Sequence, residues 1–145
     1  MTDKIHPRPL SPHLQVYRLP PTALISILHR MTGAALAVGS LMVIWWLWAA
    51  VTTISADPMI MGMDPGMPPP ATDFDNAMAF ASSPLGILLL FGWSFALYLH
   101  LLNGIRHLVW DTGRLFEKEI ATKSSYAMFG GALVLTMITW VMVYV

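Results

Sequence analysis

Two histidines, His100 and His107, are the residues of this chain best placed to do chemistry. They are seven residues apart, which is about two helical turns, so both imidazoles would lie on nearly the same face of a helix. Gly104 falls between them and leaves a flat space without a side chain. The edge of a porphyrin could lie there, and a crossing helix could equally use it. An imidazole can ligate haem iron or hydrogen-bond a neighbouring helix, and spacing alone leaves both interpretations open.

A second group of polar residues, Ser26, His29 and Arg30, falls in an apolar stretch near the N-terminus. Ser26 and Arg30 are four residues apart, so they share one face of a helix. A hydroxyl and a guanidinium that converge at a membrane edge could hydrogen-bond the carbonyl of a quinone headgroup. Helix capping and an arginine that reaches lipid phosphates explain the same residues without a ligand. For Asp111 the alternatives are a surface ion pair with an arginine and tuning or proton delivery for quinone reduction.

The elements that must position these residues are long apolar segments. The chain is 56% hydrophobic and only 11% charged, and a membrane-spanning helix needs about 20 apolar residues. We expect an all-α integral membrane protein, a bundle of three transmembrane helices. The expected segments are an interfacial arm at 1–21, spans at 22–51, 84–110 and 124–145, a periplasmic loop at 52–83, and a cytoplasmic link at 111–123.

The charges indicate how these helices are oriented. The chain has eight Lys and Arg residues, and none of them falls in the loop 52–83. That loop carries Asp57, Asp64, Asp73 and Asp75. Basic residues collect on the cytoplasmic side of membrane proteins, so we expect a cytoplasmic N-terminus and a periplasmic C-terminus.

In this orientation His100 falls near the middle of the membrane. It lies ten residues before Trp110, and a rise of about 1.5 Å per residue puts it roughly 15 Å from the end of its span. A hydrocarbon core is about 30 Å thick, and an ionisable residue within it is a functional candidate. His107, Arg106 and Arg30 lie at about the depth that haem propionates would reach. Since no other histidine lies as deep as His100, axial ligation of haem by two histidines would need a second chain.

Several classes of function are excluded by what the sequence lacks. It has no cysteine and therefore supplies no disulfide, thiolate ligand or iron–sulfur cluster. It has no nucleotide-binding loop, zinc signature or Ser–His–Asp spacing, and we expect no nucleic-acid partner. The first apolar stretch is too long for a signal peptide, and the start Met-Thr-Asp-Lys does not look like a mitochondrial presequence. We therefore expect a bacterial inner membrane protein.

Local signals predict where helices begin and pack. Thr22 follows two prolines as a candidate N-cap, and Pro84 suits a first helical turn. A short interfacial helix over Phe74–Ala81 is compatible with the loop sequence. Small residues at 33–39 and the glycine pair at 130–131 would let other helices approach closely.

Three stretches carry a resemblance to a known family. They are RPLSPHLQVYR at 8–18, SILHRMTG at 26–33, and HLLNGIRHLVWDTG at 100–113. These patterns resemble the cytochrome b556 family of succinate dehydrogenase membrane anchors, the larger anchors of complex II. They cover the N-terminal arm, the start of the first helix and the end of the second, whereas the loop 52–83 looks long for the family.

The resemblance implies roles for individual residues. His100 would be an axial ligand of a haem b shared with a smaller anchor subunit, which supplies the opposite histidine. Ser26 and Arg30 match positions that line the ubiquinone site, and Asp111 matches an acidic position near it. His29, Arg30 and His107 would lie near the haem propionates.

The resemblance also implies an assembly. This chain would pair with the second membrane anchor subunit in the lipid bilayer and dock the iron–sulfur and flavoprotein subunits on its cytoplasmic side. Electrons from succinate would reduce ubiquinone, so the chain would serve an enzyme without holding a complete active site alone. Two alternatives stay open: the anchor subunit of a quinol:fumarate reductase, and a haem-free structural anchor.

Overall fold

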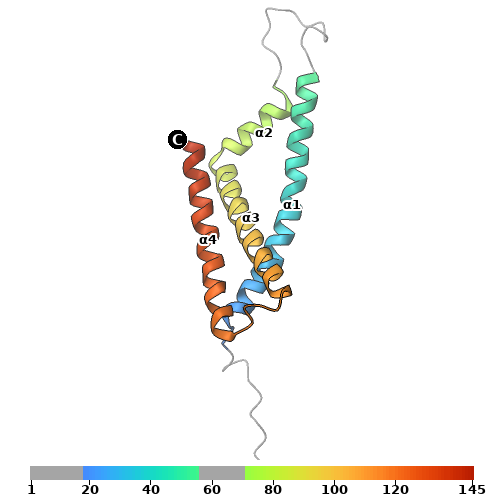
Figure 1. Cartoon of the computed structure of the whole chain (residues 1–145). Coiled ribbons are helices and arrows are strands. Elements are labelled where there is room, and N and C mark those ends of the chain that lie inside the picture. The colour runs from blue at the N-terminus through green and yellow to red at the C-terminus, as the bar shows by residue number, and fades with distance from the viewer. Residues whose placement is uncertain (1–17, 56–70) are drawn as a thin grey trace, which may run out of the picture.

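The computed structural model describes residues 18–55 and 71–145 (Figure 1). Residues 1–17 of the expected arm and residues 56–70 of the expected loop lie outside this description. The described residues form four helices, which are α1 (Pro21–Ser55), α2 (Asp73–Ser82), α3 (Pro84–Asp111) and α4 (Lys118–Tyr144). The all-helical prediction is therefore confirmed. Three of the helices, α1, α3 and α4, are long and apolar enough to cross a membrane.

Prolines and hydroxyls define the helix starts. α1 begins at Pro21, and the Ala23 N–H already donates to the Pro20 carbonyl at 3.0 Å. Thr22 therefore lies inside the first turn and is not the N-cap that the sequence predicted, because proline itself suits the first helical position. At α3 the Ser83 hydroxyl accepts from the Gly86 N–H at 3.1 Å, and Pro84 occupies the first turn as predicted.

The expected interfacial helix is α2, one residue longer at each end than predicted. Thr72 and Asp75 form a capping box: the Thr72 hydroxyl accepts from the Asp75 N–H, and the Asp75 carboxylate accepts from the Thr72 N–H. Two hydrogen bonds hold the pKa of the Asp75 carboxyl below its usual value. The bond from the Thr72 backbone N–H has the larger effect, and the bond from the Thr72 hydroxyl has the smaller one. The helix therefore begins at a fixed point shortly before α3.

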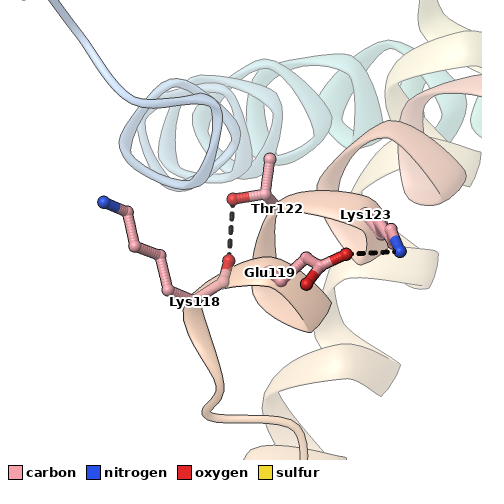
Figure 2. A network of polar contacts seen from close by, with 4 residues as sticks. All are labelled: Lys118, Glu119, Thr122 and Lys123. Atoms are coloured by element: carbon pink, nitrogen blue, oxygen red, sulfur yellow. Dashed lines mark hydrogen bonds and ion pairs between the residues drawn. The ribbon is translucent and has the colours of Figure 1, made fainter.

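α4 begins at Lys118, six residues before the apolar segment 124–145. Figure 2 shows this first turn, in which the Thr122 hydroxyl donates to the Lys118 carbonyl at 2.8 Å and Lys123 pairs with Glu119 at 2.7 Å. Hydropathy identifies only the part of a helix that can lie in lipid. The polar residues of this first turn bond to one another, so the helix extends beyond the apolar segment. The link between α3 and α4 is correspondingly shorter than 111–123.

α3 is the central helix of the bundle. It packs against α1 on one side and α4 on the other, and α2 crosses obliquely from α1 to the start of α3 (Figure 1). The start of α1 and the link between α3 and α4 lie at one end of the bundle, and α2 and the C-terminus lie at the other. The basic segments within the described residues, at the start of α1 and between α3 and α4, therefore share one end.

The core of this bundle is small. Its buried cluster consists of Ile25, Leu99 and Ala132, one from each of the three long helices. Large apolar side chains on all three helices remain exposed, as lipid or a protein partner would require. Membrane helices are held by close packing and interhelical hydrogen bonds, and α3 and α4 share such bonds. They are Tyr98–Thr139 at 2.6 Å, Trp140–Ser94 at 3.0 Å and Arg106–Ser125 at 2.9 Å.

Small residues bring α1 close to α3, as predicted. The groups of α3 that approach the α1 glycines are side chains and not the backbone. A Cβ atom at Gly39 would overlap the indole of Trp93, and one at Gly33 would lie 2.9 Å from His100 Cε1. The glycine pair of α4 is used unequally. A Cβ at Gly131 would meet Leu102 at 3.1 Å, whereas one at Gly130 would meet nothing within 4 Å in the described part of the chain.

Candidate functional site

Three histidines gather where α1 crosses α3. The rings of His29 and His100 are stacked, with centroids 4.0 Å apart and planes at 10°. His107 is tilted against the same His29 ring at 5.4 Å. His100 and His107 were predicted to lie on one face of a helix. His29 joins them, because α1 places it against both rings. We call these three residues the histidine stack.

The hydrogen bonds of His100 determine which ring nitrogen carries its proton. Nδ1 lies 3.1 Å from the His29 carbonyl and 3.4 Å from the Thr32 hydroxyl oxygen. A carbonyl only accepts, so Nδ1 donates and Nε2 of the neutral ring keeps its lone pair. No group in residues 18–55 or 71–145 hydrogen-bonds Nε2. This arrangement fits an imidazole that gives Nε2 to a metal, because a ligating histidine commonly donates its other N–H to a carbonyl.

Gly104 borders an open space in α3. Its Cβ position has no heavy atom within 4 Å among the described residues. No helix crossing inside this part of the chain uses the space, unlike the spaces at Gly33 and Gly39. The space beside Gly104, between His100 and His107, is therefore open to a group from outside the described residues.

Arg106 is directed away from the histidine stack. Its side chain is only 4% exposed, donates from Nη1 to the Ser125 hydroxyl at 2.9 Å, and lies 4.1 Å from the Trp110 ring centre. From the sequence, Arg106 matches the propionates by its depth alone. Six residues from His100 is not a whole number of turns, so the guanidinium faces α4 instead.

Ser26 and Arg30 lie together on α1, as their spacing predicted. The Arg30 Nε donates to the Ser26 backbone carbonyl at 3.5 Å, and the Arg30 side chain is otherwise exposed. Asp111 is exposed at the last residue of α3. In the described parts of the chain the one ion pair is Lys123–Glu119, so Asp111 forms none of the arginine pairs considered for it there.

Some residues of this region had no role in the sequence argument. Thr32 contacts His100 and also donates within α1, to the carbonyls of Leu28 at 2.8 Å or His29 at 3.0 Å. Asn103 is 1% exposed, and its side-chain amide has no partner among the described residues. Thr32 falls within the quoted SILHRMTG stretch, but only the relative rotation of α1 and α3 reveals its contact with His100.

The chain is similar to known proteins over nearly its full length. Residues 4–139 match the family "Succinate dehydrogenase/Fumarate reductase transmembrane subunit". A succinate dehydrogenase cytochrome b556 subunit of Paracoccus denitrificans is 44% identical over 95% of this chain and 93% of that protein. One from Rickettsia felis is 34% identical, covering 92% and 91%. A cytochrome b560 subunit of Reclinomonas americana is 33% identical, covering 92% and 85%. With three apolar helices of spanning length, the chain is a multi-pass membrane anchor and belongs to the succinate dehydrogenase/fumarate reductase transmembrane subunit family.

Proposed function

We propose that this chain is a membrane-anchor subunit of a succinate:ubiquinone oxidoreductase that holds haem b and forms part of the ubiquinone site. The observation that carries the proposal is the state of His100. Its Nδ1 is hydrogen-bonded to the His29 carbonyl, and Nε2 keeps a lone pair inside an apolar span. The relatives' names, cytochrome b556 and cytochrome b560 subunit, support a b-type haem as the ligand.

Haem would be held by His100 through its iron and by neighbouring residues through its propionates. When bound, haem b takes up and releases one electron at a time. His29, His107 and Arg30 are the candidates for the propionates. The first two belong to the histidine stack, and Arg30 is an exposed cation next to His29 in the chain. The other anchor subunit would supply a second residue to hold the iron. Arg106 is the weakest candidate, since it bonds Ser125 on α4.

Ubiquinone would bind near the start of α1. The Ser26 hydroxyl and the exposed Arg30 guanidinium can donate hydrogen bonds to a quinone carbonyl while the isoprenoid tail stays in lipid. Asp111, exposed at the end of α3, is a candidate for tuning the quinone or supplying protons. Electrons would arrive from the iron–sulfur subunit, which docks with the flavoprotein subunit on the cytoplasmic side.

The same architecture supports one other candidate, the anchor of a quinol:fumarate reductase, because the matching family includes both enzymes. The test is purification of the tagged chain from bacterial membranes in detergent. We expect the flavoprotein, iron–sulfur and second anchor subunits to co-purify and succinate to reduce ubiquinone. Faster fumarate reduction by a low-potential quinol would favour the alternative. A chain that purifies alone from intact membranes would contradict both.

A further inference from the structure

We propose that Thr32 and Gly33 are positioning residues that fix the tautomer and ring plane of His100. The inference rests on the proposed function for the group bound at Nε2. The contacts that carry it belong to α1 and α3 alone. Thr32 acts on the Nδ1 side of the ring, and Gly33 acts on the edge that leads to Nε2.

Thr32 places a second oxygen atom beside Nδ1. Its hydroxyl has one proton, which is directed at the carbonyls of Leu28 or His29, at 2.8 and 3.0 Å. A hydroxyl oxygen that donates elsewhere presents lone pairs to Nδ1, 3.4 Å away. Both oxygens near Nδ1 can therefore accept its proton, the second being the His29 carbonyl at 3.1 Å. This environment stabilises the tautomer in which Nε2 is free to ligate.

Gly33 sets where the ring lies. A Cβ atom there would be 2.9 Å from His100 Cε1 and 3.4 Å from Nδ1, and Cε1 is the ring atom that joins Nδ1 to Nε2. The His100 ring face is meanwhile stacked on His29 at 4.0 Å. The ring is thus packed on one face and along one edge, so any side chain at position 33 would move Nε2.

These contacts matter because partners of a ligating histidine determine its basicity and orientation. A more basic imidazole stabilises ferric over ferrous iron, and ligand hydrogen bonds are one of the means by which a protein tunes haem potential. Loss of a hydrogen-bond acceptor at Nδ1 should therefore raise the midpoint potential of the haem. A displaced ring should weaken haem retention.

The experiment compares four variants of the detergent-purified complex with the wild type. Thr32→Val removes the hydroxyl at nearly constant shape, and Thr32→Ser restores it. Gly33→Ala adds the Cβ atom, and Gly130→Ala adds one to open space on α4. The readouts are haem per complex, the low-temperature EPR spectrum of the oxidised haem, and its midpoint potential.

We expect Thr32→Val to retain haem with a displaced low-field EPR signal and a raised midpoint, while Thr32→Ser and Gly130→Ala match the wild type. Gly33→Ala should weaken haem binding by about tenfold or more. If the Gly33→Ala complex does not assemble, the comparison of Thr32→Val with Thr32→Ser tests the proposal.

Two results would overturn the inference in distinguishable ways. The first is a wild type that contains haem together with a Thr32→Val variant whose spectrum and potential are unchanged, or whose potential falls. This result removes the positioning role and leaves the proposed function standing. An intact wild-type complex without haem removes the haem site and the positioning role together.

Discussion

The two ring nitrogens of His100 differ in how they are satisfied inside an apolar span. A buried ring nitrogen without a partner is unfavourable, and Nδ1 finds one in the His29 carbonyl. Nε2 has none in the described parts of the chain. A histidine that merely joined two helices would be expected to satisfy both nitrogens, so this asymmetry favours the ligand interpretation over the packing one. It could not be predicted from spacing, because it depends on which α1 carbonyl meets α3.

At the same scale, the quinone-site proposal predicts a selective loss of activity. Ser26→Ala removes a hydroxyl donor, and Arg30→Leu removes the charged guanidinium with its N–H donors. Such bonds to polar or charged groups contribute about 1–3 kcal/mol, so succinate:ubiquinone turnover should fall by roughly tenfold. Succinate oxidation with an artificial dye, which bypasses the quinone, should persist.

Ser40→Ala is the matched control for this prediction. Ser40 lies on the same helix and is exposed, with its hydroxyl bonded to its own helix at Ala37 O, 2.7 Å away. This variant should have normal quinone kinetics. Normal kinetics in both Ser26→Ala and Arg30→Leu would exclude these residues from the site.

At the scale of elements, Arg106 shows the limit of arguments from depth. The sequence fixes how far along α3 a residue lies, but the direction of its side chain depends on how α4 packs. Arg106 proves to join α3 to α4 through Ser125. By contrast, the start of α3 could be predicted from local chemistry, because Pro84 suits a first helical turn and lies there. Gly113 comes just after its end, at a positive φ of 78°.

Ser125→Ala should loosen the contact between α3 and α4. It removes the one side-chain hydrogen bond that the Arg106 guanidinium makes among the described residues, and an unsatisfied buried donor costs about 1–3 kcal/mol, more if charged. We expect thermal denaturation of the purified complex at a lower temperature.

Ser124→Ala is the control for the Ser125 prediction. Each serine hydroxyl donates to the Ala121 carbonyl at 2.9 Å, but only Ser125 accepts from Arg106. Equal stability of the two variants would contradict the assigned role of the Arg106–Ser125 bond.

At the scale of the whole molecule, composition was enough to predict three spanning helices. Hydropathy depends only on residue type, and the apolar runs are long. What it could not predict is the histidine stack, which needs the relative rotation of α1 and α3. Hydropathy also could not predict where α4 begins, because that helix includes the polar turn shown in Figure 2. A bundle with so small a core also implies that lipid and partner subunits supply much of the packing.

The orientation of the bundle is directly testable because the chain has no cysteine. Asp73→Cys lies on α2 and Glu119→Cys on the first turn of α4, at opposite ends of the bundle. The positive-inside pattern predicts that a membrane-impermeant maleimide labels Asp73→Cys in cells with a permeabilised outer membrane. Glu119→Cys should be labelled only after the inner membrane is opened, and the reverse pattern would invert the proposed topology.

The most direct test of the central proposal is the reduced-minus-oxidised visible spectrum of the purified complex. Wild type is compared with His100→Leu and with His107→Leu, which lies on the same face about two turns along α3. We predict a b-type band in the wild type, its retention in His107→Leu, and its loss or alteration in His100→Leu with partner subunits still attached. No band in an intact wild-type complex, or an unchanged band in His100→Leu, would contradict the assignment of His100 as the haem ligand.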